Sequence, residues 1–73
     1  MMLREDFYIG FAHYTVRWDG KIGNHVLIQW VEDGWDDDYQ EPSYTGVVIF
    51  VGHYDKCIAE FRRLVVEYTE SLF

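Results

Sequence analysis

The chain has 73 residues, a formal net charge of −7, an apolar share of 49% and an aromatic share of 19%. This length accommodates one small domain, and so many apolar and aromatic side chains exclude intrinsic disorder. The negative charge argues against direct binding of nucleic acid or of an anionic membrane, and it favours a basic partner or simple solubility. A domain of this size buries only about 60% of its unfolded surface, so we expect its stability to need dense packing or self-association.

The composition also favours a cytoplasmic protein. Cys57 is the only cysteine, so no intramolecular disulfide can form, as is usual in a reducing compartment. The first residues include Arg4, Glu5 and Asp6 and lack the apolar core of a secretory signal. The longest apolar run, residues 47–51, is far shorter than the roughly 18 residues of a membrane span.

The first half of the chain predicts a β-hairpin. Residues 7–18 are rich in aromatic and β-branched side chains and predict a long strand. Asp19 and Gly20 follow directly and are typical of a hairpin turn, because both residue types tolerate positive φ. We expect the second strand over residues 24–32.

A turn centred on Asp19 and Gly20 fixes a register between these two strands. It places Phe11 opposite Ile28, Ile9 opposite Trp30, and His13 opposite Val26. The other face of this hairpin is also largely apolar. A longer loop with Gly23 opposite Trp18 keeps every side chain on the same face, whereas a slip by one residue would exchange the two faces.

Residues 32–44 differ from the rest of the chain, with six acidic side chains, no basic one and three aromatic rings in thirteen positions. Outside this segment seven acidic residues face six basic ones, so the net charge is concentrated here. We predict an acidic aromatic loop. Its candidate partner-binding residues are Glu32, Asp33, Trp35, Asp36, Asp37, Asp38, Tyr39 and Glu41.

The last third of the chain predicts a strand followed by a helix. Residues 45–52 carry no charge and are rich in β-branched side chains, which favours a central, well-buried strand. Residues 55–72 show the period of an amphipathic helix, with Asp55 as the expected N-cap. The predicted apolar stripe consists of Ile58, Phe61, Val65, Tyr68 and Leu72, widened by Cys57 and Leu64.

These elements predict a single α+β domain, in which a three-stranded antiparallel β-meander (about 7–18, 24–32 and 45–52) is packed by one C-terminal amphipathic helix (about 55–72). One helix covers only one face of such a sheet, and both faces of the first hairpin are apolar. Either the acidic loop folds over the second face with Trp35 and Tyr39, or a second copy covers it in a homodimer.

No pattern in the sequence indicates catalysis, a metal or another cofactor. Calcium loops beginning at Asp33 or Asp36 would each have an acidic residue where an EF-hand needs glycine. We expect His13 and His25 to point to opposite faces of the sheet, so the histidines do not converge on a metal site. Cys57 lies on the apolar stripe of the helix with no expected base beside it. We therefore predict a protein that is not an enzyme.

The acidic segment is better suited to binding a basic surface. Six carboxylates over ten extended residues give about one charge per 5 to 6 Å, whereas duplex DNA carries about one per 1.7 Å. This spacing is closer to the phosphates of a single strand, so partial mimicry of nucleic acid is geometrically feasible. Trp35 and Tyr39 are aromatic anchors of the kind found in binding hot spots.

A tiny, acidic, aromatic-rich chain without catalytic groups is similar to small phage-encoded inhibitors such as anti-CRISPR and anti-restriction proteins, although the resemblance is one of composition and includes no shared motif. Our leading hypothesis is a non-catalytic inhibitor or adaptor that engages a basic, nucleic-acid-handling surface of a larger protein. The alternative is a self-associating structural or accessory domain whose acidic loop serves only solubility. A calcium-responsive module is a third hypothesis.

Overall fold

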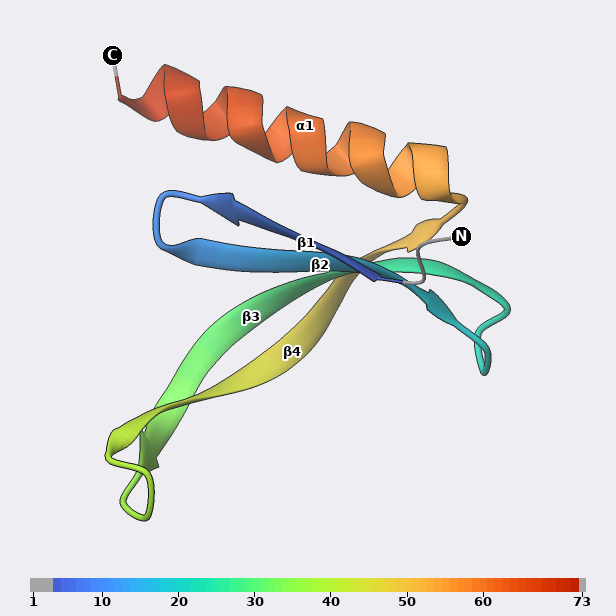
Figure 1. The fold of residues 1–73 in the computed structure, drawn as a ribbon. Coiled ribbons are helices and arrows are strands. Elements are labelled where there is room, and N and C mark those ends of the chain that lie inside the picture. The colour runs from blue at the N-terminus through green and yellow to red at the C-terminus, as the bar shows by residue number, and fades with distance from the viewer. Residues whose placement is uncertain (1–3, 73) are drawn as a thin grey trace.

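The computed structural model describes residues 4–72, which form one antiparallel sheet and one helix (Figure 1). The elements are β1 (Arg4–Ile9), β2 (Ala12–Asp19), β3 (Asn24–Asp36), β4 (Glu41–Gly52) and α1 (Tyr54–Ser71). The strands lie in the order β1-β2-β3-β4, each antiparallel to the next. The α+β class with a C-terminal helix is confirmed, whereas the prediction of three strands is wrong because the sheet has four.

The predicted strand over residues 7–18 is broken by a turn at Gly10 and Phe11. Gly10 has a φ of 59°, in the left-handed region that other residues avoid, and Ile9 pairs with Ala12 across the turn. A glycine at the first central position suits a two-residue hairpin turn, because the turn then twists in the same sense as its strands. The aromatic residues on both sides of Gly10 favour a continuous strand, so the sequence does not predict this turn.

The turn between β2 and β3 lies where the sequence predicts it but is longer than two residues. Asp19 pairs with Asn24, and its carboxylate accepts hydrogen bonds from the backbone N–H groups of Lys21 (2.9 Å) and Ile22 (3.1 Å). The bond from Ile22 contributes most to lowering the pKa of Asp19. The N–H of Gly23 donates to the Asp19 carbonyl at 2.8 Å and closes the turn.

The longer turn shifts the pairing of β2 with β3 by four residues from the predicted register. Opposite Ile28, Trp30 and Val26 lie Thr15, His13 and Arg17, in place of the predicted Phe11, Ile9 and His13. Because the shift is even, the side chains of β2 and β3 keep their predicted faces. Ile9 does not, since it belongs to β1 and is buried on the opposite face from Trp30.

Helix α1 lies across one face of the sheet and closes a hydrophobic core there (Figure 1). The buried members of this core are Ile9, Tyr14, Val16, Leu27, Cys57 and Phe61. The ring of Phe61 stacks on Phe7 with centroids 4.8 Å apart and meets Tyr14 edge-on at 5.6 Å. Cys57 is a fully buried core side chain, and its burial raises the pKa of the thiol.

Two predictions about the helix are wrong in detail. It begins at Tyr54 with His53 as its N-cap, so Asp55 lies in the first turn and does not cap it. The predicted apolar stripe is buried only in its first half, at Cys57 and Phe61. The later members Val65, Tyr68 and Leu72 are exposed by 37%, 43% and 62%. The last turn of the helix runs past the β1–β2 turn, where no sheet lies beneath it (Figure 1).

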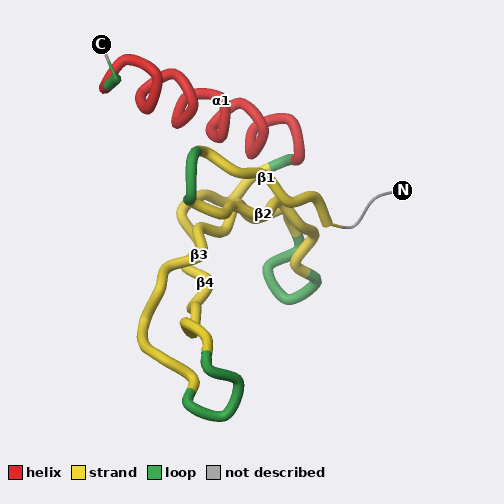
Figure 2. Tube along the Cα trace, turned by 60° about the vertical axis from the view of Figure 1, so that its left-hand side comes forward, coloured by secondary structure: helices red, strands yellow, loops and turns green. Residues whose placement is uncertain are grey.

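The charge-free strand is not central. Among the residues that the structure describes, β4 is an edge strand with β3 as its one neighbour, and most of its residues are exposed. The prediction of a buried strand is wrong because an apolar run reports composition and does not reveal how many neighbours the strand has. The first residues of β4 and the last residues of β3 continue beyond the other strands and form a two-stranded arm (Figures 1 and 2).

The arm gives the molecule an extended shape. The Cα radius of gyration is 13.8 Å, compared with about 11 Å for a compact domain of this length. The principal extents are 40 × 38 × 19 Å, so the molecule is wide and thin. Figure 2 shows the arm pointing away from the side that α1 covers. Of the two alternatives for covering the second face, cover by Trp35 and Tyr39 is not observed, because these side chains are exposed by 56% and 76%.

Candidate binding surface: an acidic arm and an aromatic cleft

The acidic segment is mostly strand, contrary to the predicted loop. In the part we call the acidic arm, residues 32–44, β3 and β4 pair from Glu32 opposite Tyr44 to Asp36 opposite Glu41. Only residues 37–40 form the connecting turn. The arm therefore holds the predicted site residues on a defined hairpin instead of a flexible loop.

Asp33 joins the two strands of the arm. It lies at a register irregularity between Glu32 and Gly34, and its carboxylate accepts hydrogen bonds from the hydroxyls of Ser43 (2.8 Å) and Thr45. These bonds, that from Thr45 first, lower the pKa of the Asp33 carboxyl. These hydrogen bonds give Asp33 a structural role in the acidic arm.

Asp36 holds the turn at the tip of the arm. One of its carboxylate oxygens accepts hydrogen bonds from the backbone N–H groups of Asp38 (3.0 Å) and Tyr39 (3.3 Å). Gln40 adopts a φ of 55°, and its side-chain amide donates to the carbonyl of Asp37 at 2.6 Å. Aspartate is favoured in such turns because its short side chain reaches the backbone two and three residues ahead.

The other acidic side chains of the arm are free to meet a partner. Within residues 4–72 no hydrogen bond or ion pair involves the side chains of Glu32, Asp37, Asp38 or Glu41. Trp35 and Tyr39 are exposed by 56% and 76%. The structure thus places all eight predicted residues on one arm and divides them into two that hold its shape and six that are open to solvent.

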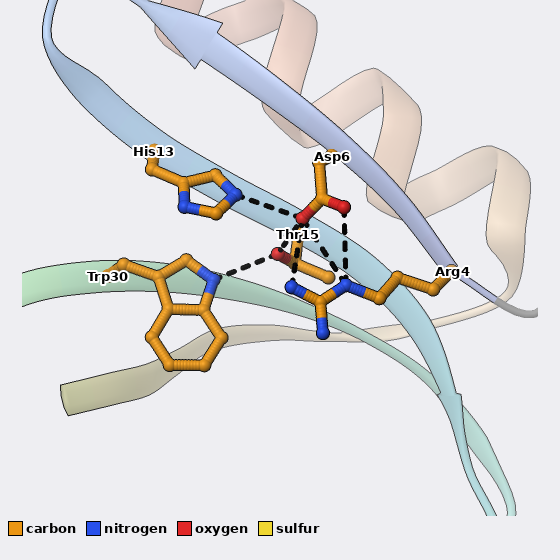
Figure 3. A network of polar contacts seen from close by, with 5 residues as sticks. All are labelled: Arg4, Asp6, His13, Thr15 and Trp30. Carbon is orange, nitrogen blue, oxygen red and sulfur yellow. Dashed lines mark hydrogen bonds and ion pairs between the residues drawn. The ribbon is translucent and has the colours of Figure 1, made fainter. Parts of the chain in front are cut away.

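A polar network on the sheet face opposite the helix is the second feature of this surface (Figure 3). Asp6 of β1 is its centre: its carboxylate accepts hydrogen bonds from Arg4 Nε (3.2 Å) and Thr15 Oγ1 (2.7 Å) and lies 2.9 Å from His13 Nε2. Thr15 is fully buried and accepts a hydrogen bond from Trp30 Nε1 at 2.8 Å. Together these bonds join β1, β2 and β3 on this face.

The same network sets the charge of Asp6. The Arg4 guanidinium is the main cause that holds the pKa of the Asp6 carboxyl far below its usual range, followed by the Thr15 hydroxyl and His13. The carboxylate is therefore charged at neutral pH and is balanced by Arg4. Every hydrogen-bonding group of the buried Thr15 side chain is occupied, so the network costs little to bury.

An aromatic cleft of about 450 Å³ opens beside this network. It is lined by Arg4, Tyr8, Phe11, His13, Trp30 and Tyr44. The His13 ring stacks between Tyr8 and Trp30, with centroids 4.8 Å and 5.9 Å away. Gly46 leaves the space that Trp30 occupies, because a Cβ there would lie 3.1 Å from the indole ring.

Sequence reasoning did not identify this cleft. Its lining comes from β1, β2, β3, β4 and the β1–β2 turn, and the correct register is needed to bring these side chains together. Tyr44 belongs to both the cleft and the acidic arm, so the two features form one continuous surface. Phe11 is fully exposed at the rim, and large exposed rings beside a cleft are typical of contact sites.

The part of the chain that the structure describes contains no group of three or more His, Cys, Asp or Glu side chains placed to hold a metal ion. His13 and His25 lie on opposite faces of the sheet, as their partners in the register show. Within residues 4–72, no helix is both long enough and apolar enough to cross a membrane.

Comparison of the chain with models of known protein families, with curated proteins and with solved structures found no match. The function of the protein must therefore be argued from the geometry of its own surface. It defines a small α+β protein whose helix-covered core carries a projecting acidic arm and an aromatic cleft.

Proposed function

We propose that the protein is a non-catalytic inhibitor or adaptor that uses the acidic arm to engage a basic surface of a larger protein. One observation carries this proposal: the acidic arm projects beyond the hydrophobic core and contributes no side chain to it. The arm instead presents unpaired carboxylates and exposed aromatic rings. A hairpin of this kind is not needed to close the hydrophobic core. We infer that it serves an interaction.

The pattern of ion pairs supports this role. On the helix, Arg63 pairs with both Glu60 and Glu67, so the acidic residues there are partly neutralised within the molecule. Asp37 and Asp38, at the tip of the arm, have no such partner within residues 4–72. Unpaired like charges on a projecting hairpin attract a basic surface at long range and accelerate its association.

The aromatic groups supply the contact area that charges alone do not. Trp35 and Tyr39 are exposed beside the carboxylates, and the cleft next to the arm accommodates an apolar or aromatic side chain of the partner. A charged tip combined with an aromatic cleft fits a basic surface that also presents an apolar group. Surfaces that handle nucleic acid combine these features, so partial mimicry of nucleic acid by the arm is part of the proposal.

The experiment compares two variants with equal loss of charge. Asp37→Asn with Asp38→Asn removes the two free carboxylates at the tip, and Asp55→Asn with Glu70→Gln removes one carboxylate from each end of α1. A partner captured from cognate lysate and identified by mass spectrometry is then purified, and its binding kinetics are measured with each variant across salt concentrations. Asp33 and Asp36 are left unchanged because they hold the arm together.

We expect the tip variant to associate more slowly and with a weaker salt dependence, since steering is screened within roughly 10 Å at 0.1 M salt. The helix variant should associate like the wild type. Trp35→Ala should instead increase the dissociation rate of the complex, with a loss of about 2 kcal/mol in binding free energy. Competition for the partner by single-stranded DNA would support nucleic-acid mimicry. If the binding kinetics of both the tip variant and Trp35→Ala are unchanged, the arm does not bind the partner and serves only solubility.

A further inference from the structure

The free edge of β4 is the feature that the proposed function leaves unused. β4 is twelve residues long and, within residues 4–72, pairs with β3 alone, so its other side presents unpaired backbone N–H and C=O groups. Residues 42–52 contain no charged side chain. Val47, Val48, Ile49 and Val51 are exposed by 44%, 46%, 39% and 45%.

Edge strands of monomeric proteins are usually protected against pairing with another chain. They are short, carry charges, contain proline within the strand or are covered by another element. β4 has a proline only near its beginning, at Pro42, and a register irregularity beside Ile49. The charge-free stretch of residues 44–48, between the two register irregularities of the β3–β4 pair, has none of the usual protection.

We propose that two copies of the chain pair through β4, antiparallel about a twofold axis near Val47, to form one continuous eight-stranded sheet. Val47 is the centre of the charge-free run of residues 42–52, so a twofold axis there pairs this run with itself. Each copy then satisfies the unpaired backbone groups of the other. Val47 faces Val47 of the other copy, and Gly46 faces Val48, across the new pair of strands.

The distribution of charge selects the antiparallel arrangement and a second copy as the occupant. Parallel pairing would bring the two acidic arms side by side, which repels. Antiparallel pairing separates the arm tips and brings the Glu41 end of β4 near the beginning of α1 of the partner copy. There Lys56 offsets Asp55, and the helix N-terminus adds partial positive charge.

The accessible surface of the whole molecule is large enough to leave room for an interface with a second copy. The accessible surface is 5565 Å², whereas a monomer of 8.8 kDa is expected to expose about 4,800 Å². The excess of about 800 Å², to which the projecting arm also contributes, is similar in size to what one partner buries in a protein–protein interface of standard size. This inference does not rest on the proposed function, because residues 37–40 at the tip of the arm stay outside the paired strands.

The test uses sedimentation velocity of the full chain over a range of concentrations. We expect the wild type to form a dimer, and Val47→Lys and Val47→Glu to be folded monomers by themselves, because like charges would face each other across the twofold axis. Each should weaken self-association about tenfold or more. An equimolar mixture of the two variants should restore the dimer, since opposite charges then meet. The control Val66→Lys places the same charge on the exposed surface of α1 and should leave the dimer unchanged.

A second measurement covers the case in which a substitution disturbs folding. Hydrogen exchange of wild-type backbone amides in residues 43–51 should slow as protein concentration rises, while amides of the β1–β2 turn keep a constant rate. A wild type that stays monomeric over the whole concentration range overturns the proposal. So does a mixture of folded Val47 variants that fails to dimerise, or exchange along β4 that does not depend on concentration.

Discussion

Asp6 and Thr15 show how single residues stabilise the face of the sheet that no helix covers. Asp6 accepts hydrogen bonds from Arg4 and Thr15, and Thr15 in turn accepts one from the indole N–H of Trp30. Three strands are joined by two short side chains, so the aromatic rings around them keep fixed positions. A cleft whose walls are preorganised in this way loses less conformational entropy when a ligand binds.

The first prediction concerns Asp6→Asn and its dependence on pH. The pKa of Asp6 is lowered in the folded state from 3.8, so its charge stabilises the fold at pH values above the unfolded pKa, and this contribution is lost as the pH falls below about 4. We expect the variant to be less stable at pH 7 by about 1 kcal/mol, because the side chain is 38% exposed and water screens its interactions.

Urea unfolding at pH 7 and at pH 2.5 measures this difference. The gap in free energy of unfolding between wild type and Asp6→Asn should narrow at the lower pH. Asp37→Asn is the control, since its side-chain carboxylate makes no hydrogen bond within residues 4–72. A gap of the same size at both pH values would mean that Asp6 acts through its shape and not through its charge.

At the scale of elements, α1 is bound to the sheet by its first half. Phe61 is buried against Phe7 and Tyr14, whereas Leu72 is 62% exposed beyond the end of the sheet. We expect Phe61→Ala to lower the free energy of unfolding by roughly 3 to 5 kcal/mol through the cavity it leaves. Leu72→Ala should change it by less than about 0.5 kcal/mol. Thermal melting of both variants measures these changes. Equal losses of stability in the two variants would mean that the main contact between α1 and the sheet does not lie at Phe61.

The elements that the sequence predicts well are those whose signal is local. The three- and four-residue spacing of Ile58, Phe61 and Val65 predicts the helix, and Asp19 with Gly20 predicts a turn. The break at Gly10 is missed because a single glycine competes with a long aromatic run. The edge position of β4 is missed because apolar periodicity does not report how many neighbours a strand has.

The candidate site divides in the same way. The acidic arm is contiguous in the sequence, so its charge and its aromatic residues can be recognised without a structure. The structural roles of Asp33 and Asp36 depend on hydrogen bonds to Ser43, Thr45 and the turn backbone, which composition does not reveal. The cleft joins residues as distant as Arg4 and Tyr44, and it exists only once the register of four strands is set.

For the molecule as a whole, the acidic arm and the core are separate units joined by β3 and β4. No member of the core cluster or of the side chains packed on it lies between Ile28 and Ile49, so the arm projects without contributing to core packing. The large radius of gyration for this length reflects that division. A domain whose folding does not depend on its binding hairpin tolerates changes in the hairpin, as loops on a rigid scaffold do.

The last prediction tests this division by shortening the arm. Replacing residues 33–43 with Asn-Gly leaves Glu32 and Tyr44 as the closing pair of a two-residue hairpin, the register they already have. Cooperative unfolding should persist with a change below about 1 kcal/mol, because the core keeps every contact and the connection becomes shorter. Self-association through β4 should weaken only modestly, since Tyr44 and the residues after it remain. Binding to the basic partner should be lost. Thermal melting, sedimentation and the kinetic assay measure the three outcomes on one variant, and an unfolded product would show that the arm supports the core after all.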